Sequence, residues 1–203
     1  MTEGRYLLKG LTLPDGSKSK IEIRDGKISA VAKKIERDKD VVEVDLTGSV
    51  VLPGLVDLHT HLREPGKEDA ETVLSGSQAA ARGGFTAVSA MANTSPVADT
   101  AGVVEQVYRL GQSAGLVDVF PIGAVTQGIQ GEHLAEIGAM ADSAARVRVF
   151  SDDGNCVFDP LVMRRALEYI KKFDGVIAQH AQEPRLTQAS QMNEGFVSSQ
   201  LGL

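Results

Sequence analysis

From residue 51 onward, short apolar runs alternate with stretches in which apolar residues recur at helical spacing. That spacing predicts helices over residues 69–82, 101–114, 132–143 and 160–173. The apolar runs predict strands over residues 51–59, 85–91, 116–124, 146–150 and 176–179. Regular strand–helix units of this size indicate a parallel sheet, either doubly wound or closed into a (β/α)8 barrel. The polar stretch that follows Pro184 is expected to be helical.

The first 50 residues have a different pattern, of short strands and turns. Strand-like segments occupy residues 5–10, 11–13, 19–24, 27–31 and 41–46. Asp25 and Gly26 form a hairpin signal between two of these segments. Because this part has too little apolar surface for a core of its own, we expect it to pack against another part of the protein. The sequence thus predicts a small β unit over residues 1–50 and an α/β domain over residues 51–203.

Two histidines end the first strand of the α/β domain. His59 and His61 are two residues apart, and side chains at this spacing on a strand point to the same face. Two neutral imidazole nitrogens on a stiff backbone form a chelate that suits a divalent metal, zinc first. A His-x-His pair in an arbitrary sequence is more often solvated, but this pair ends an apolar strand. Arg63 continues the same face, where its planar guanidinium suits a substrate carboxylate.

Polar residues also follow the other predicted strands. Asn93 comes after the second strand, Asp152 and Asp153 after the fourth, and His180 after the fifth. The carboxyl ends of the strands of a (β/α)8 barrel converge on one mouth, where active sites are built, so this placement favours the barrel. No glycine-rich phosphate-binding fingerprint follows the first strand, which counts against a nucleotide-binding sheet.

Together these residues suggest a hydrolytic metal site. The candidate ligands are the three histidines at the strand ends and one of the two aspartates: His59, His61, His180, and Asp152 or Asp153. Zinc bound in this way lowers the pKa of a bound water molecule to about 7, and the resulting hydroxide attacks an amide carbonyl. Each residue also has a plainer interpretation, because residues 151–154 suit a polar turn, Asn93 suits a turn before Pro96, and His180 suits a buried histidine.

Composition narrows the function classes. The net charge is −6 without a basic run, and aromatic residues make up 4%, so nucleic acid and anionic membranes are not expected partners. The first residues lack the apolar core of a secretory signal, and no apolar run is long enough to span a bilayer. Cys156 is the only cysteine, which excludes an intrachain disulfide and fits a cytoplasmic protein. A barrel typically needs about 250 residues, so we expect this chain to be part of a longer polypeptide.

The sequence resembles the dihydroorotase family of the amidohydrolase superfamily, and its bacterial type I branch in particular. The resemblance lies in LPGLVDLHTHLREPG (52–66), GGFTAV and MANT (83–94), VFSDDG (149–154), DPLVMRRALEY (159–169), AQH (178–180) and NEG (193–195). It implies a metal-dependent-hydrolase (β/α)8 TIM barrel, of which this chain holds about the first five βα units. Residues 1–50 then resemble the first part of the small β-sandwich domain of the family.

The resemblance implies the reversible, zinc-dependent cyclisation of N-carbamoyl-L-aspartate to L-dihydroorotate in pyrimidine biosynthesis. Its metal site, with one or two zinc ions per subunit, corresponds to His59, His61, Asp153 and His180, with Asp153 as a ligand or bridge. Its substrate carboxylate is bound by the residues that correspond to Arg63 and Asn93. A homodimer and an association with aspartate carbamoyltransferase are possible partners on the same basis.

The chain departs from the family pattern at three places. Ala181 stands where many relatives have a cysteine, and neither the strand-six histidine nor the strand-eight aspartate that acts as general base has a counterpart. Two other functions are considered. A hydantoinase or allantoinase would carry a carboxylated lysine after strand four, where residues 149–153 hold none. A non-catalytic scaffold for aspartate carbamoyltransferase would not need the His-x-His pair.

Overall fold

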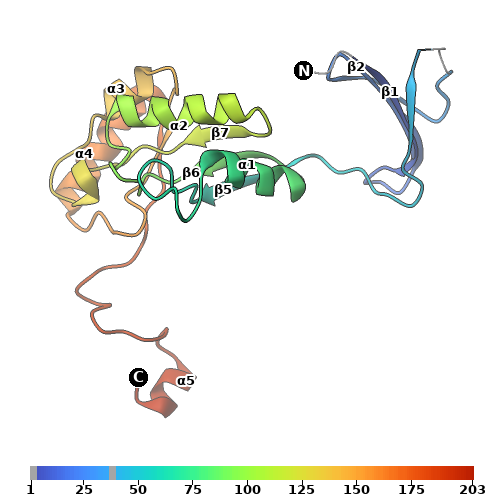
Figure 1. Ribbon diagram of the computed structural model, residues 1–203. Helices are drawn as coiled ribbons and strands as arrows, with labels where there is room; N and C mark the ends of the chain where they lie inside the picture. The colour runs from blue at the N-terminus through green and yellow to red at the C-terminus, as the bar shows by residue number, and fades with distance from the viewer. Residues whose placement is uncertain (1–3, 37–39) are drawn as a thin grey trace. The chain divides into compact units, whose positions relative to one another are not determined.

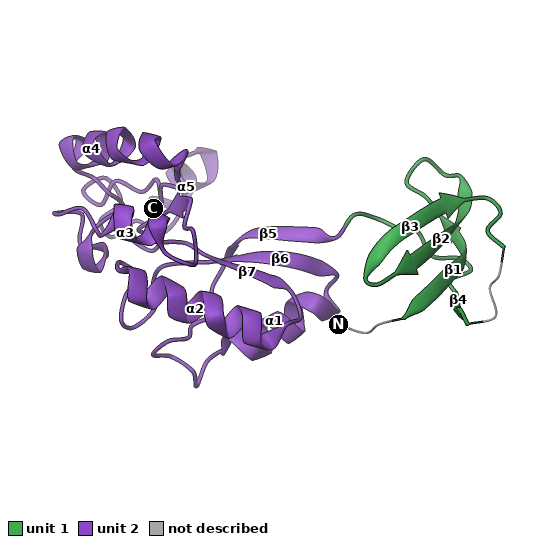
Figure 2. Ribbon diagram, turned by 90° about the horizontal axis from the view of Figure 1, so that it is seen from above, with its two compact units in different colours: residues 1–53 green, residues 54–203 purple. Residues whose placement is uncertain are grey.

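The computed structural model describes residues 4–36 and 40–203, and these fall into two compact units (Figures 1 and 2). Unit 1 is Met1–Pro53 and unit 2 is Gly54–Leu203. The described strands of unit 1 form one sheet, whereas every described helix and the parallel strands β5 to β9 lie in unit 2. None of the helices in the described part of the chain has the length and hydropathy that crossing a bilayer requires.

Unit 1 is a four-stranded sheet in the order β3-β2-β1-β4. The strands are β1 (Arg5–Thr12), β2 (Lys18–Arg24), β3 (Lys27–Ala32) and β4 (Val42–Asp45). The first three pair antiparallel, and β4 pairs parallel with β1. The two apolar pieces predicted at 5–10 and 11–13 are one strand, whose Leu7 and Leu11 are buried together with Ile21 of β2.

A charged cluster lies on the same sheet. The Glu22 carboxylate accepts hydrogen bonds from Arg5 and Arg24, both at 3.0 Å, and from the Ser29 hydroxyl at 2.9 Å. These hydrogen bonds, led by the one from Arg24, lower the pKa of Glu22 from 4.5 to about 2. The cluster therefore links strands β1, β2 and β3 through one carboxylate that stays charged down to strongly acidic pH.

Unit 2 contains a parallel sheet. Strands β5 (Leu55–Thr60), β6 (Phe85–Ala90) and β7 (Asp118–Pro121) form one sheet in sequence order, and β8 (Val149–Phe150) pairs with β9 (Val176–Ile177). A parallel bridge between Gly123 and Phe150 joins the segment after β7 to β8. The strand predicted from residue 51 begins at Leu55, because Val51 instead donates its amide to Thr12 of unit 1 at 2.9 Å. Consecutive strands therefore lie side by side without a reversal of order among the described strands.

The helices of unit 2 are α1 (Val73–Arg82), α2 (Ala101–Ala114), α3 (Ile137–Asp142), α4 (Pro160–Ile170) and α5 (Phe196–Leu201), with short 3-10 turns at Gln127–Ile129 and Lys171–Phe173. Three of the helical ranges predicted from the sequence are longer than the helices that the structure contains. Helix α1 begins only after Thr72, whose hydroxyl caps the Ser75 amide. Helix α3 begins five residues late, and in the stretch after Pro184 only α5 is helical, because the rest lacks an apolar face.

Helices α1 and α2 cover one face of the β5-β6-β7 sheet, as Figure 2 shows. The approach of α2 to β7 depends on Gly111, since a Cβ atom at this position would lie 2.5 Å from the Cβ atom of Val119. Val88 and Val119 are paired across β6 and β7 and are buried on this face. Because strand side chains alternate, the neighbouring Ser89 and Phe120 project to the opposite face.

Candidate metal centre

The ends of strands β5 and β6 are joined by hydrogen bonds around the histidine pair. Thr60, which lies between the two histidines, donates its hydroxyl to the Ser89 carbonyl at 2.8 Å and accepts the Met91 amide at 2.9 Å. The His59 amide donates to the Asp57 carboxylate at 3.0 Å. These contacts fix the backbone that carries both imidazoles relative to the segment that follows β6.

His59 and His61 meet Asp153, which follows β8. Their Nε2 atoms each lie 3.4 Å from the same carboxylate oxygen, Asp153 Oδ2. One donor atom from each of the three residues falls within 4.8 Å of the others, a grouping that could hold a metal ion. The Asp153 side chain is only 11% exposed, whereas that of His59 is 52% exposed. The structure thus brings together three predicted ligands that come from the ends of the first and fourth predicted strands of the α/β domain.

The spacing within this cluster suits a metal ion of the size of zinc. Four ligand atoms placed tetrahedrally at about 2.1 Å from an ion are about 3.4 Å apart. The two nitrogen–oxygen distances of 3.4 Å match that separation, and they are longer than ordinary hydrogen bonds between these atoms. Two imidazole nitrogens and a carboxylate oxygen are also a donor set that zinc accepts. The residues therefore fit a metal ion.

His180 lies on the other side of the same carboxylate. Its Nδ1 is 3.2 Å from Asp153 Oδ1, and its Nε2 is 3.1 Å from the Gln182 side-chain oxygen. These two contacts, Gln182 first, raise the pKa of His180 above its usual value. His180 is not one of the three residues whose donor atoms cluster. The structure places it next to Asp153, and its role as a ligand stays a prediction.

Asp152 points away from the histidines into the protein. Asp152 is 1% exposed. Its carboxylate accepts hydrogen bonds from the amides of Val125 at 2.8 Å and Thr126 at 3.0 Å, and from the Thr126 hydroxyl. Burial raises the pKa of Asp152, and the three hydrogen bonds oppose that shift. We call this set of contacts the Asp152 clamp. It ties the segment after β7 to the turn that presents Asp153.

Sequence reasoning missed two residues of this region. Thr126 completes the clamp and also accepts the Gly131 amide at 2.9 Å, and Gln182 holds His180. Thr126 lies just beyond a predicted strand, so its position at a strand end was a usable signal. Nothing in the sequence pattern distinguishes Gln182 from other polar residues that follow β9.

The segments that carry Arg63 and Asn93 are packed against each other. The Ser95 amide donates to the Pro65 carbonyl at 2.9 Å, and a Cβ atom at Gly66 would lie 1.9 Å from the Ser95 carbonyl oxygen. Arg63 has a positive φ of 62°, and its side chain makes no hydrogen bond or ion pair with residues 4–36 or 40–203. Asn93 contacts the cluster directly, since its Oδ1 lies 3.0 Å from His61 Nδ1.

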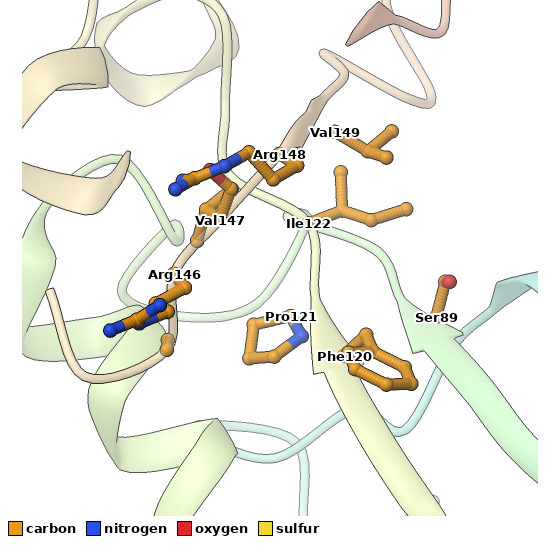
Figure 3. Close-up of a pocket in the computed structure, with 9 residues that line it drawn as sticks. Ser89, Phe120, Pro121, Ile122, Arg146, Val147, Arg148 and Val149 are labelled. Atoms are coloured by element: carbon orange, nitrogen blue, oxygen red, sulfur yellow. The ribbon is translucent and has the colours of Figure 1, made fainter. Parts of the chain in front are cut away.

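A separate pocket lies between strands β6 and β7 and the segment that leads into β8 (Figure 3). It is lined by Ser89, Phe120, Pro121, Ile122 and residues 145–149, and it contains none of the candidate ligands. The Nη1 atom of Arg148 donates to the Ala141 and Val147 carbonyls, both at 2.8 Å. This apolar pocket is therefore distinct from the metal cluster.

The chain matches the family described as dihydro-orotase-like over residues 48–203. It is 63% identical over 203 residues to a dihydroorotase of Leifsonia xyli and 62% identical over 200 residues to a dihydroorotase of Streptomyces coelicolor. It is 53% identical over 189 residues to a dihydroorotase of Mycobacterium tuberculosis. These matches cover 93–100% of this chain but only 44–46% of the relatives, so the chain spans about half their length.

Solved structures with a similar fold include an L-hydantoinase (dihydropyrimidinase) from Arthrobacter aurescens, with a TM-score of 0.74 at 22% identity. That match covers 91% of this chain and 42% of the hydantoinase. A dihydropyrimidinase from Brevibacillus agri has a TM-score of 0.66 at 18% identity, over 88% of this chain and 40% of its own. At these identities the likeness concerns the fold alone.

Proposed function

The chain belongs to the dihydro-orotase-like family, and from this membership we propose that it is the N-terminal, metal-binding portion of a bacterial type I dihydroorotase. The reaction is the reversible cyclisation of N-carbamoyl-L-aspartate to L-dihydroorotate, a step of pyrimidine biosynthesis in the cytoplasm. The observation that carries the proposal is the single Asp153 oxygen at 3.4 Å from both His59 and His61. These two nitrogens and one oxygen are the kind of ligands that a hydrolytic zinc ion requires.

In this proposal the metal is zinc, held by His59, His61 and Asp153, with His180 as a further ligand. The two oxygens of Asp153 face different histidines, Oδ2 toward His59 and His61 and Oδ1 toward His180. A carboxylate with this arrangement suits a bridge between two ions, so one or two zinc ions per subunit are compatible with it. When bound, zinc polarises an amide carbonyl and lowers the pKa of a water molecule to about 7.

Arg63 and Asn93 are proposed to bind the free carboxylate of the substrate. The guanidinium of Arg63 has no partner among the residues that the structure describes, so its donors are available to an anion. Its left-handed backbone costs a non-glycine residue free energy, and strain of this kind is concentrated at ligand-binding sites. Recognition of a carboxylate would separate dihydroorotate from hydantoins that lack one.

The finer fold assignment is part of the same proposal. The sequential order of the parallel strands in unit 2 supports about five βα units of a (β/α)8 barrel over residues 51–203. The antiparallel strands of unit 1 support the first part of a small β-sandwich domain over residues 1–50. A homodimer and an association with aspartate carbamoyltransferase are proposed partners, on the family resemblance alone.

The experiment uses a hybrid enzyme, in which this chain replaces the matching 46% of the Leifsonia xyli relative. Hydrolysis of dihydroorotate and of hydantoin is measured by chromatography, with the unaltered relative as positive control. We expect the hybrid enzyme to prefer dihydroorotate and to lose turnover with His59→Ala or Asp153→Ala. Faster hydrolysis of hydantoin would favour a hydantoinase-like amidase, and a folded hybrid enzyme without zinc or turnover would favour a non-catalytic scaffold.

A further inference from the structure

The side chain of Asn93 lies at the junction between the metal cluster and the segment proposed to bind substrate. Its Oδ1 is 3.0 Å from His61 Nδ1. An amide oxygen can only accept a hydrogen bond, so with this end of the amide toward His61 the proton of the contact belongs to His61 Nδ1, which donates. In a neutral imidazole with a proton on Nδ1, the lone pair is on Nε2.

That lone pair faces the cluster. His61 Nε2 lies 3.4 Å from Asp153 Oδ2, which is also an acceptor when the carboxylate is ionised. For a neutral imidazole, two electron-rich atoms at this distance repel unless a cation lies between them. The contact with Asn93 therefore holds His61 in the neutral tautomer whose Nε2 can coordinate a metal ion. In the absence of a metal ion, the same tautomer places two acceptors, His61 Nε2 and Asp153 Oδ2, opposite each other.

The position of Asn93 is set by the backbone around it. The Met91 amide donates to the Thr60 carbonyl at 2.9 Å, which joins the end of β6 to the peptide just before His61. The Thr94 and Ala98 amides both donate to the Ala92 carbonyl, at 2.9 and 3.0 Å. Asn93 is thus held between two anchored residues, and its amide oxygen meets His61 without a long flexible side chain.

The other end of the amide is unused. Asn93 Nδ2 makes no hydrogen bond with residues 4–36 or 40–203, and it would lie 3.8 Å from a Cβ atom at Gly154, next to Asp153. We propose that Asn93 is the positioning residue for His61: its oxygen selects the Nδ1–H tautomer, while its NH2 group stays available to the substrate. One side chain would then couple metal binding to recognition of the substrate carboxylate. This inference rests on the proposed function only for the identity of the substrate.

The first test needs no substitution. Long-range nitrogen–proton NMR correlations on the metal-free chain, recorded at a pH at which the His61 ring is neutral, identify which of its nitrogens carries the proton. We expect Nδ1–H in the wild-type chain, and a His61 with its proton on Nε2 would overturn the proposal. Because this experiment uses neither metal nor substrate, its result is independent of whether the chain belongs to a dihydroorotase.

The second test separates the two ends of the amide. Asn93→Asp keeps an acceptor for His61, so its zinc affinity, measured by competition with a chelator, should stay within about threefold of wild type. Asn93→Leu has no acceptor and should lose about 10- to 100-fold in zinc affinity, the range typical for partners of a ligating histidine. Gln112→Glu and Gln112→Leu on the exposed side of α2 are matched controls and should change nothing. Unchanged zinc affinity in Asn93→Leu would overturn the inference.

The hybrid enzyme completes the test. There Asn93→Asp should retain zinc but raise KM for dihydroorotate at least about tenfold, because its carboxylate repels that of the substrate. An unchanged KM would contradict the role of the NH2 group. If the hybrid enzyme does not hydrolyse dihydroorotate while the tautomer and zinc results hold, the proposed function fails and the positioning role stands. If it hydrolyses dihydroorotate while Asn93→Leu keeps the zinc affinity of wild type, the positioning role fails and the proposed function stands.

Discussion

The Asp152 clamp makes a stability prediction that the structure allows to be worked through. Replacing Asp152 with alanine leaves two backbone amides and one hydroxyl, those of Val125 and Thr126, without their acceptor inside the protein. Each buried group left unpaired costs about 1–3 kcal/mol. Against this, the substitution removes a carboxylate whose burial disfavours its charged form. We expect a loss of about 3 kcal/mol in the free energy of unfolding, a large part of the roughly 5–15 kcal/mol typical of a domain.

Asp152→Asn distinguishes the acceptor from the charge. Its amide oxygen can still accept the Val125 and Thr126 amides, and only the acceptor for the Thr126 hydroxyl is lost. The expected loss is therefore about 1–1.5 kcal/mol, the size of one hydrogen bond. Asp69→Ala and Asp69→Asn are the matched controls, because Asp69 is exposed and its side chain makes no hydrogen bond in the described part of the chain. These controls should change stability by less than about 0.5 kcal/mol.

Urea unfolding followed by circular dichroism measures these differences. The chain has no tryptophan, and every described helix lies in unit 2, so the helical signal reports the unit that holds the clamp. A loss below about 1 kcal/mol in Asp152→Ala would show that water or a shifted backbone replaces the carboxylate. Equal losses in the alanine and asparagine variants would show that the charge matters and the acceptor geometry does not.

Three further outcomes follow from the structure. His59→Ala should reduce zinc affinity at least about 100-fold. His133 is an exposed histidine outside the cluster, so His133→Ala should leave zinc affinity unchanged. The zinc that each variant retains after dialysis measures this difference. Gly66→Ala should destabilise unit 2 by more than about 2 kcal/mol in urea unfolding, because its Cβ atom would meet the Ser95 carbonyl. Gly84 also has a positive φ, but no atom lies near its Cβ position, so Gly84→Ala should cost only about 1 kcal/mol. The pKa of Glu22 in the folded protein, about 2, lies below its usual 4.5, so its contribution to stability is present above pH 4.5 and is lost as the pH falls toward 2. Hydrogen exchange of β2 should therefore differ between wild type and Glu22→Gln at neutral pH and converge near pH 2.

The strands were predictable because their apolar runs are separated by clear turn residues. The Asp25–Gly26 turn connects β2 and β3 as predicted, and β6 matches its predicted range within one residue. The start of α3 was not predictable from local spacing. Leu134 lies within the predicted helix, but it forms an antiparallel bridge with Thr126, and the Ala135 amide donates to the Val125 carbonyl at 2.9 Å. A pairing with another part of the chain here overrides a helical pattern.

The site was predictable in its residue types and in its place at the strand ends. A parallel sheet brings these ends to one edge, and this is enough to expect His59, His61 and Asp153 near one another. The contacts that tune the site were not predictable, because they join side chains to loops whose shape the sequence pattern does not specify. The pairing of Asn93 with His61 and that of Asp152 with Thr126 both belong to this group.

The surroundings of the two adjacent aspartates differ in a way that residue order alone does not reveal. The residues alone allowed either Asp152 or Asp153 as the metal ligand. Three donors from Val125 and Thr126 occupy the oxygens of Asp152, which is turned into the core. The oxygens of Asp153 face imidazole nitrogens of three histidines, and its amide is held by the Ser151 hydroxyl at 3.1 Å. Because its oxygens are held in this way, Asp152 is not free to face the histidines, and the geometry favours Asp153 as the ligand.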